Sequence, residues 1–128
     1  QHINQVADNQ SKCPFCKPVS RLHLLAETPL SYAVLDGYPV AKGHTLIIPK
    51  RHVADYFELT FEEQKDLVQL SNFVQKRIKA DFQPDGFTTG MNIGKSAGQK
   101  FPHASLHIIP RYTGDCKNPS GGIRAILR

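Results

Sequence analysis

The chemistry in this sequence centres on a short stretch near position 105, in which polar side chains alternate with apolar ones. His103, Ser105 and His107 recur at every second position, with an apolar residue between each pair. In an extended chain, side chains two positions apart emerge on the same face, about 6.6 Å apart. The pattern therefore predicts a strand over 103–111 that presents two imidazoles and a hydroxyl on one face. The alternative is a pair of hydrogen-bonded interior histidines without chemistry.

Two cysteines near the start of the chain, Cys13 and Cys16, are the second chemical signal. The first twelve residues are polar and lack the apolar run of a secretory signal, so we expect a cytoplasmic protein without structural disulfides. The pair then indicates a metal site or a redox pair. Pro18 disfavours the helix that would lower the pKa of a redox thiol. The other possible metal ligands are His2, His23, His44, His52, His103, His107 and Cys116.

Charge is distributed unevenly along the chain. Residues 1–86 hold ten basic and ten acidic side chains, whereas residues 87–128 hold six basic side chains against Asp115 alone. The net charge of +5 therefore lies in the part that carries the histidine stretch, which favours a small anionic ligand such as a phosphate ester. A nucleic-acid surface is the competing interpretation, but no dense Lys/Arg cluster with interleaved aromatic residues is present. No apolar run approaches the length of a membrane-spanning helix.

A single domain must position these side chains, since 128 residues with 40% apolar and 21% charged content fit one globular core. Apolar runs bounded by turn residues predict strands over 21–26, 31–35, 45–48, 87–93 and 103–111. A helical turn is expected within 53–59. Thr60 and Glu63 form a capping box ahead of apolar residues at helical spacing, which predicts a helix over 60–80. This order predicts an α+β domain, a mainly antiparallel five-stranded sheet covered by one long helix.

The histidine stretch and its flanks resemble the active-site strand of the histidine triad (HIT) superfamily, and the resemblance covers roughly residues 13–122. That family alternates three histidines with apolar residues after a Gly-Gln turn. Here Gly98-Gln99 precedes the stretch, and Ile108-Ile109-Pro110-Arg111 follows it. One position departs from the pattern, since Ser105 stands where the family has its nucleophilic histidine. A shifted register with His107 as the nucleophile would misplace the flanking residues.

The resemblance implies a HIT-like fold with a structural zinc ion. Zinc-containing members of the superfamily combine an N-terminal Cys-x-x-Cys pair with the histidine of a Pro-Lys-x-His segment and the first histidine of the triad strand. The matching positions are Cys13, Cys16, His52 and His103. Four protein ligands leave no open position for chemistry, so the zinc would be structural. Cys116 is left as an ordinary thiol.

The resemblance also implies a nucleotide site, in which the family's third histidine holds phosphate oxygens. The matching residues are Leu35, Asp36, His44, Leu46, Asn92, Gln99, Lys100 and His107. Asp36 matches the position that grips the ribose hydroxyls, while Asn92 and Gln99 are expected beside the phosphate. Lys100 replaces the family's usual Ser or Thr, and would add a cation or reach solvent. A turn-forming Asp36 and loop-capping amides at Asn92 and Gln99 are the structural alternatives.

The implied function is purine nucleotide binding, with a parent activity of hydrolysis or transfer at the α-phosphate of a dinucleoside polyphosphate or nucleoside phosphoramidate. A neutral imidazole is nucleophilic near pH 7, whereas a Ser hydroxyl needs an adjacent base. With Ser105 and His107 in the catalytic positions, we expect weak or absent turnover. Ser105 is a disabling substitution that traps nucleotide, a natural variant that binds without turnover, or a nucleophile with His103 or His107 as its base.

Two functions from other classes remain as alternatives. One is a non-catalytic nucleotide sensor or interaction module, and the other is a small zinc-bearing nucleic-acid binder. Members of the superfamily commonly form dimers by joining sheets, so a homodimer is expected. We divide the chain into a loose N-terminal arm over 1–12, a HIT-like nucleotide-binding domain over 13–122 and a C-terminal tail over 123–128.

Overall fold

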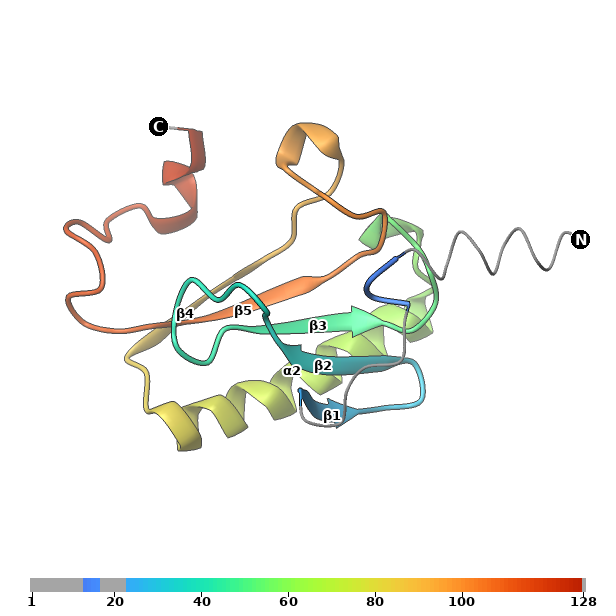
Figure 1. The fold of residues 1–128 in the computed structure, drawn as a ribbon, viewed down its shortest axis with the longest axis horizontal. Helices are drawn as coiled ribbons and strands as arrows, with labels where there is room; N and C mark the ends of the chain where they lie inside the picture. Colours follow the sequence, from blue (N-terminus) through green and yellow to red (C-terminus); the bar gives the residue numbers. More distant parts are fainter. Residues whose placement is uncertain (1–12, 17–22, 128) are drawn as a thin grey trace, which may run out of the picture.

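The computed structural model describes residues 13–16 and 23–127, and its elements are shown in Figure 1. The strands are β1 (Leu24–Glu27), β2 (Ser31–Leu35), β3 (Thr45–Pro49), β4 (Gly86–Gly90) and β5 (Leu106–Arg111). The long helix is α2 (Phe61–Phe82), and the short 3-10 segments are η1 (Tyr56–Glu58), η2 (Lys95–Ala97) and η3 (Gly122–Leu127). The predicted arm over 1–12 lies outside the described residues.

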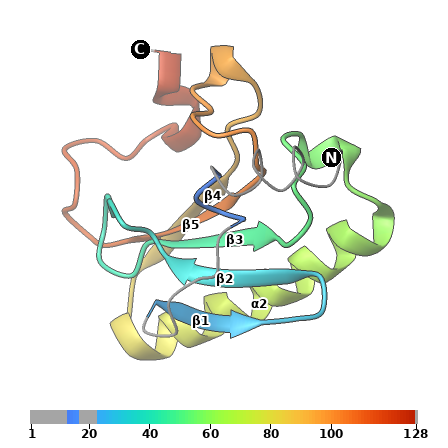
Figure 2. The same ribbon diagram turned by 45° about the vertical axis from the view of Figure 1, so that its right-hand side comes forward.

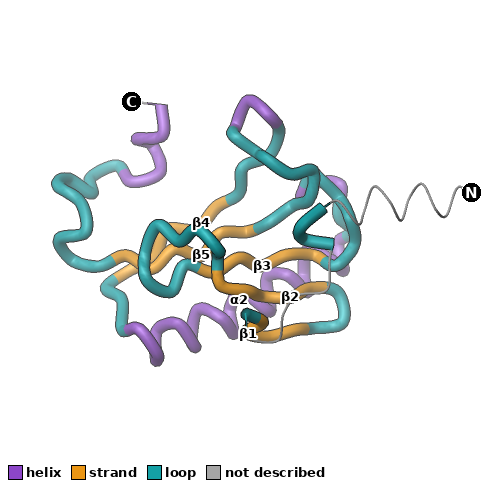
Figure 3. Tube along the Cα trace, in the orientation of Figure 1, coloured by secondary structure: helices purple, strands orange, loops and turns teal. Residues whose placement is uncertain are grey.

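The strands form one antiparallel sheet in the order β1-β2-β3-β5-β4 (Figure 3). The last strand therefore lies between β3 and β4, and its register sets His107 opposite Leu46. Because β5 reaches this place only after the helix, the sheet brings residues from both halves of the chain side by side. This architecture confirms the α+β fold class that the sequence predicts.

Helix α2 begins where the capping box predicts. The Thr60 hydroxyl accepts a hydrogen bond from the Glu63 N–H at 3.1 Å, and the Glu63 carboxylate accepts one from the Thr60 N–H at 2.8 Å. Arg51, in the loop after β3, donates to both oxygens of the same carboxylate at 2.8 and 2.9 Å. The start of the helix is thereby tied to the loop that carries His52.

The two faces of the sheet are covered differently. On one face the strands and the loop after β3 join α2 in the main core, whose buried members are Ala33, Ile47, Val53, Leu59, Leu67, Leu70, Val74, Ile78 and Ile108. Alternate residues of β2 and β3 form a second apolar cluster, Tyr32, Val34, Leu46 and Ile48, with Phe15 packed against it. Side chains alternate across a strand, so the two clusters lie on opposite faces. Figure 2 shows α2 along one face of the sheet, which leaves the other face for a ligand.

Two predicted strand boundaries are wrong. The last strand begins at Leu106 rather than at His103. The Ala104 N–H donates to the Val53 carbonyl at 2.7 Å, so this segment bonds to the loop after β3 instead of to β4. β4 ends at Gly90 rather than at residue 93, because its partner strand is shorter than predicted. β1 begins at residue 24, and positions 21 and 22 of its predicted range lie outside the described residues.

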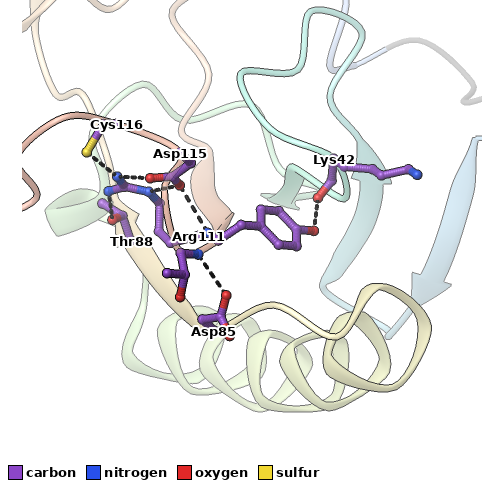
Figure 4. A network of polar contacts seen from close by, with 8 residues as sticks. Lys42, Asp85, Thr88, Arg111, Asp115 and Cys116 are labelled. Carbon is purple, nitrogen blue, oxygen red and sulfur yellow. Dashed lines mark hydrogen bonds and ion pairs between the residues drawn. The ribbon is translucent and has the colours of Figure 1, made fainter.

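A polar network fastens the segment that follows β5 (Figure 4). Arg111 donates to both oxygens of Asp115 at 2.7 and 2.9 Å, and Tyr112 donates its hydroxyl to the Lys42 carbonyl at 2.7 Å. Cys116 is exposed, and its sulfur accepts from Arg111 at 3.3 Å. The network joins the start of the C-terminal segment to the loop before β3. Cys116 belongs to this network through its contact with Arg111.

No helix in the described part of the chain is long and apolar enough to cross a bilayer. The helical turn expected within 53–59 is present as η1, capped by the Asp55 side chain. The division between a domain over 13–122 and a tail over 123–128 stays a prediction, and η3 runs across that boundary.

Candidate functional site

A cavity of about 710 Å³ opens on the sheet face opposite α2. One side of it, called the apolar wall below, consists of Tyr32, Val34, Leu46 and Ile48. The β2–β3 register sets Val34 directly opposite Leu46 and Tyr32 opposite Ile48, so these side chains form one continuous surface. The size and lining of the cavity suit a small molecule with a flat apolar part.

The histidine row, His103, Ser105 and His107, lines the same cavity. Only His107 belongs to β5, and Ser105 lies immediately before that strand. The three side chains therefore share the cavity, as the alternation predicts, although the regular strand is shorter than expected. The structure thus brings two imidazoles and a hydroxyl next to an apolar wall.

A chain of hydrogen bonds fixes the proton on His107. The Val40 N–H donates to His44 Nδ1 at 3.1 Å, so a neutral His44 carries its proton on Nε2. That nitrogen lies 2.9 Å from His107 Nδ1 and 3.3 Å from Asp36 Oδ2. His107 Nδ1 must then act as the acceptor, which places the proton of His107 on Nε2. His107 consequently offers an N–H donor to a ligand in the cavity.

Burial keeps both histidines neutral. It lowers the pKa of His44, where the nearby Asp36 charge opposes the effect and the neighbouring His107 adds to it. Burial likewise lowers the pKa of His107 against the opposing influence of Asp36. Two imidazoles 2.9 Å apart cannot both carry a charge without strong repulsion. The neutral, directed arrangement is therefore the stable one near pH 7.

Backbone geometry places His44 and Asp36 in this series of hydrogen bonds. Gly43 has a φ of 90°, and a Cβ atom there would lie 2.9 Å from the Phe82 ring, so the turn before His44 requires glycine. The Asp36 N–H donates to the His44 carbonyl at 2.9 Å, and Asp36 Oδ1 accepts from the Tyr38 N–H at 2.8 Å. Asp36 therefore forms the turn that the structural alternative proposes, while Oδ2 still faces the two histidines.

The predicted metal ligands come together beside the cavity. Cys13, Cys16, His52 and His103 place their four ligand atoms within 4.8 Å of one another. Cys16 Sγ lies 3.0 Å from His52 Nδ1 and 3.3 Å from His103 Nδ1, and Cys13 Sγ lies 3.5 Å from His103 Nδ1. The edges of a tetrahedron around one ion with bonds of about 2.0–2.3 Å would be about 3.3–3.8 Å long. The cluster can hold a metal ion.

The surroundings of the cluster suit a cation. His103 Nε2 donates to the Pro49 carbonyl at 2.7 Å, which leaves the lone pair of Nδ1 for the cluster. Without a cation, burial raises the pKa of the Cys16 thiol to about 11, and the adjacent Cys13 adds to this effect. A bound cation reverses this preference, because thiolates are the metal-binding form. The donor set therefore fits a soft or borderline divalent metal such as zinc.

The described hydrogen bonds of the two histidines in the row go to groups other than Ser105. His107 Nδ1 is engaged by His44, and its other nitrogen carries a proton. His103 directs Nδ1 to the cysteines, and its Nε2 bonds to the Pro49 carbonyl. A hydroxyl is a weak nucleophile unless a base removes its proton. The geometry therefore gives Ser105 no partner within the row for nucleophilic attack.

The loop before the row contributes groups of different kinds. Asn92, Gln99 and Lys100, which are predicted to bind nucleotide, line the cavity. The Gln99 side chain accepts from the Gly94 N–H at 2.8 Å and donates to the Ala54 carbonyl at 2.9 Å. It therefore closes its own loop, which was the structural alternative for this residue. Lys100 is exposed at the cavity edge, where a cation can meet a phosphate from the solvent side.

Comparison with known proteins identifies the family. A family model described as the HIT domain matches residues 17–114. The chain belongs to the HIT family. It is 41% identical over 102 residues to the adenosine 5'-monophosphoramidase of Schizosaccharomyces pombe, covering 77% of this chain and 74% of that protein. It is 40% identical over 91 residues to the bis(5'-adenosyl)-triphosphatase of Dictyostelium discoideum, covering 71% of this chain and 61% of that protein.

A solved HIT family protein from Bacillus anthracis has the same fold. It matches with a TM-score of 0.75 at 34% identity, covering 91% of this chain and 87% of that chain. The fold and the family predicted for this HIT domain are therefore confirmed. The matched segment contains the whole histidine row together with Asp36 and His44.

Sequence reasoning missed part of the cavity of this HIT domain. The missed lining residues are Phe15, His23, Tyr32, Val34, Tyr38, Val40, Ile48 and Phe101. The alternation of β2 and β3 could have shown Val34 and Ile48, since they share a face with Leu46, which the sequence analysis named. Phe15 carries no such signal, because it lies between two cysteines in a turn.

Proposed function

We propose that this HIT protein binds a purine nucleoside monophosphate unit, with the base on the apolar wall and the α-phosphate at His107. The observation that carries the proposal is the chain of hydrogen bonds from the Val40 N–H through His44 to His107 Nδ1, beside an apolar surface. This chain assigns the proton of a neutral His107 to Nε2, which makes that atom a donor for a ligand. Phosphate oxygens accept strongly from such donors. Lys100 adds a positive charge at the cavity edge.

The remaining assignments follow the order of the lining groups. Leu35 continues the apolar wall beside the base, and Asp36 accepts from the ribose hydroxyls with the lone pairs that its turn leaves free. Asn92 donates its amide to the phosphate. Gln99 acts through its loop rather than directly, because its amide is already bonded at both ends.

The parent activity is hydrolysis or transfer at the α-phosphate of a dinucleoside polyphosphate or nucleoside phosphoramidate. In that reaction a histidine nitrogen at position 105 forms a bond to the α-phosphorus while the bond to the leaving group breaks. Water or another acceptor then resolves the nucleotidyl-histidine. Ser105 cannot take this role, since neither histidine of the row offers it a base. The names of two relatives, a phosphoramidase and a triphosphatase, support this chemistry.

The test compares the unchanged chain with Ser105→His. Release of AMP is measured from diadenosine tetraphosphate and from an adenosine phosphoramidate, and AMP binding is measured separately by calorimetry. We expect AMP to bind both proteins and Ser105→His to release it at least about a thousandfold faster. Ser120→His, on the exposed C-terminal segment, is the control for adding a histidine elsewhere. If Ser105→His binds AMP but releases none from either substrate, the parent activity is overturned. If neither protein binds AMP, the proposed function is overturned.

A nucleotide sensor or interaction module is the second candidate. The lack of a base for Ser105 favours it, because binding groups are then present without a competent nucleophile. The same experiment separates the two functions. Binding of AMP without turnover in Ser105→His would favour the sensor.

We also propose that the metal is zinc, held by Cys13, Cys16, His52 and His103. Two observations support this choice. The cluster offers sulfur and nitrogen donors, and the Pro49 carbonyl accepts a hydrogen bond from His103 Nε2, which leaves Nδ1 for the metal. When bound, the ion would hold the three segments of the site together, with no open position for a reacting group. We expect about one zinc ion per chain in elemental analysis, lost in Cys16→Ser. Cys116→Ser is the matched control, because that thiol bonds to Arg111 outside the cluster, and it should keep its zinc.

We further expect a cytoplasmic homodimer. The described part of the sheet ends at β4 on one side and β1 on the other, and an edge strand can pair with a second copy. Analytical ultracentrifugation at several concentrations would report the dimer. A molecular mass equal to that of a single chain at every concentration would contradict the dimer.

A further inference from the structure

The turn that carries the two metal-binding cysteines also contributes a side chain to the nucleotide cavity. Phe15, between Cys13 and Cys16, lines the cavity and packs against the apolar wall. Its ring meets the His103 ring edge-on at 5.8 Å and the Phe101 ring at 5.9 Å. An aromatic edge in this position continues the surface on which a flat base would lie.

The contacts of this turn with the rest of the molecule are few. Within the described residues, the polar ones are the two cysteine sulfurs against His52 and His103, and the Tyr32 hydroxyl, which donates to the Phe15 carbonyl. Tyr32 is itself part of the apolar wall. The groups that would bind the metal are therefore among those that hold the Phe15 ring in place.

His103 joins the two sites directly. Its Nδ1 atom belongs to the metal cluster, and its ring lies in the cavity lining against Phe15. A metal ion on Nδ1 would hold this ring and the two thiolates in one arrangement. Without the ion, the buried Cys13 thiol, the half-buried Cys16 thiol and the two imidazoles would have only weak hydrogen bonds to maintain this arrangement.

We propose that metal binding at the Cys13–Cys16 turn sets the affinity of the cavity for the nucleotide base, with Phe15 as the side chain that transmits the effect. This inference rests on the proposed nucleotide binding at the same cavity. Because such coupling is reciprocal, bound nucleotide must strengthen metal binding by the same factor by which the metal strengthens nucleotide binding. A coupling of about 5–150-fold is typical of two linked sites.

The test measures AMP affinity by calorimetry for the zinc-loaded protein and for the protein after chelation. Circular dichroism of both samples shows whether the fold is retained. We expect AMP to bind the loaded protein about 5–150-fold more tightly. Equal AMP affinity in both forms would overturn the coupling while leaving the proposed function intact. No AMP binding by the loaded protein would overturn the proposed function and this inference together.

A reciprocal measurement covers the case in which the metal-free protein unfolds. Transfer of zinc from the loaded protein to a coloured chelator is followed with and without AMP. AMP should protect the zinc in the unchanged chain, whereas Phe15→Ala should hold zinc but lose the protection. Phe57→Ala removes an exposed aromatic ring outside the cavity and should keep it. Equal protection in Phe15→Ala and Phe57→Ala would rule out Phe15 as the link.

Discussion

Ser105 stands between His103 and His107 in the row, and the described hydrogen bonds of both imidazoles go to other groups. His103 has partners at both ring nitrogens, the cysteine sulfurs and the Pro49 carbonyl, whereas His107 is bonded through Nδ1 to His44. A hydroxyl needs an adjacent base to become a nucleophile. We therefore expect Ser105 to be a poor nucleophile, while the groups around it suit the proposed phosphate binding.

Removal of the hydroxyl should consequently change little. We expect Ser105→Ala to bind AMP within about threefold of the unchanged chain, since no described hydrogen bond depends on the hydroxyl and a neutral contact contributes about 1 kcal/mol or less. Background nucleotide release should also be the same in the two proteins. A loss of release in Ser105→Ala would show that the hydroxyl is the nucleophile.

The neutral histidines predict a dependence of stability on pH. Their folded-state pKa values lie below the usual 6.5, so the unfolded chain binds more protons as the pH falls through 6.5. Stability is then greatest above that pH and decreases toward acid. Urea unfolding at about pH 7.5 and about pH 5.5 should show this loss, and His107→Asn should show less of it. An equal loss in His107→Asn would place the effect in other groups.

At this scale the sequence predicted which residue types meet, and it could not predict their protons. The spacing of His103 and His107 and the Cys-x-x-Cys pair lead to the cavity and the cluster, and the structure brings both sets together. The proton of His107 depends on the Val40 N–H, which acts through His44 from a loop distant in sequence. No local sequence pattern predicts hydrogen bonds between segments so far apart in the sequence.

At the scale of elements, local signals were sufficient for the helix and insufficient for the strand ends. The capping box of α2 lies within four consecutive residues, and both of its hydrogen bonds form. The start of β5 instead depends on the Val53 carbonyl, far away in the sequence, which takes the Ala104 N–H from the ladder. Strand boundaries follow from such distant partners, which explains why the alternation extended the predicted strand too far.

The capping box makes a direct prediction for stability. We expect Thr60→Ala to lower the free energy of unfolding by about 1 kcal/mol, because it removes the acceptor for the Glu63 N–H. Thr60→Ser keeps that hydroxyl and should remain close to the unchanged chain. Urea denaturation followed by circular dichroism measures both variants. Equal losses in the two variants would mean that the cap hydrogen bond is not the cause.

At the scale of the whole molecule, the sheet separates stability from binding. The α2 face carries most of the buried apolar side chains, and the opposite face carries the cavity. Changes on the helix side should therefore alter folding without altering the ligand site, as long as the protein remains folded. The basic excess of residues 87–128 lies in the segment that supplies the histidine row and Lys100.

A pair of neighbouring helix residues tests this separation. Leu67 is buried against the sheet, and Leu67→Ala should cost about 2–5 kcal/mol of unfolding free energy. Val68, the next residue, is 46% exposed, and Val68→Ala should cost no more than about 0.5 kcal/mol. Both variants should bind AMP like the unchanged chain under conditions where circular dichroism shows them folded. Weakened AMP binding by folded Leu67→Ala would show that the two faces communicate.

The position of β5 between β3 and β4 has a consequence for the order of events during folding. Pairing of Thr45 with Ile108 closes a loop that contains the whole of α2 and β4, and closing long loops is slow. His52 and His103 lie near opposite ends of that loop, and Cys13 and Cys16 precede it, so closing the loop brings His103 to the other three donors. Uptake of a coloured divalent metal during refolding should therefore follow helix formation, and its rate should report the pairing of β5 with β3.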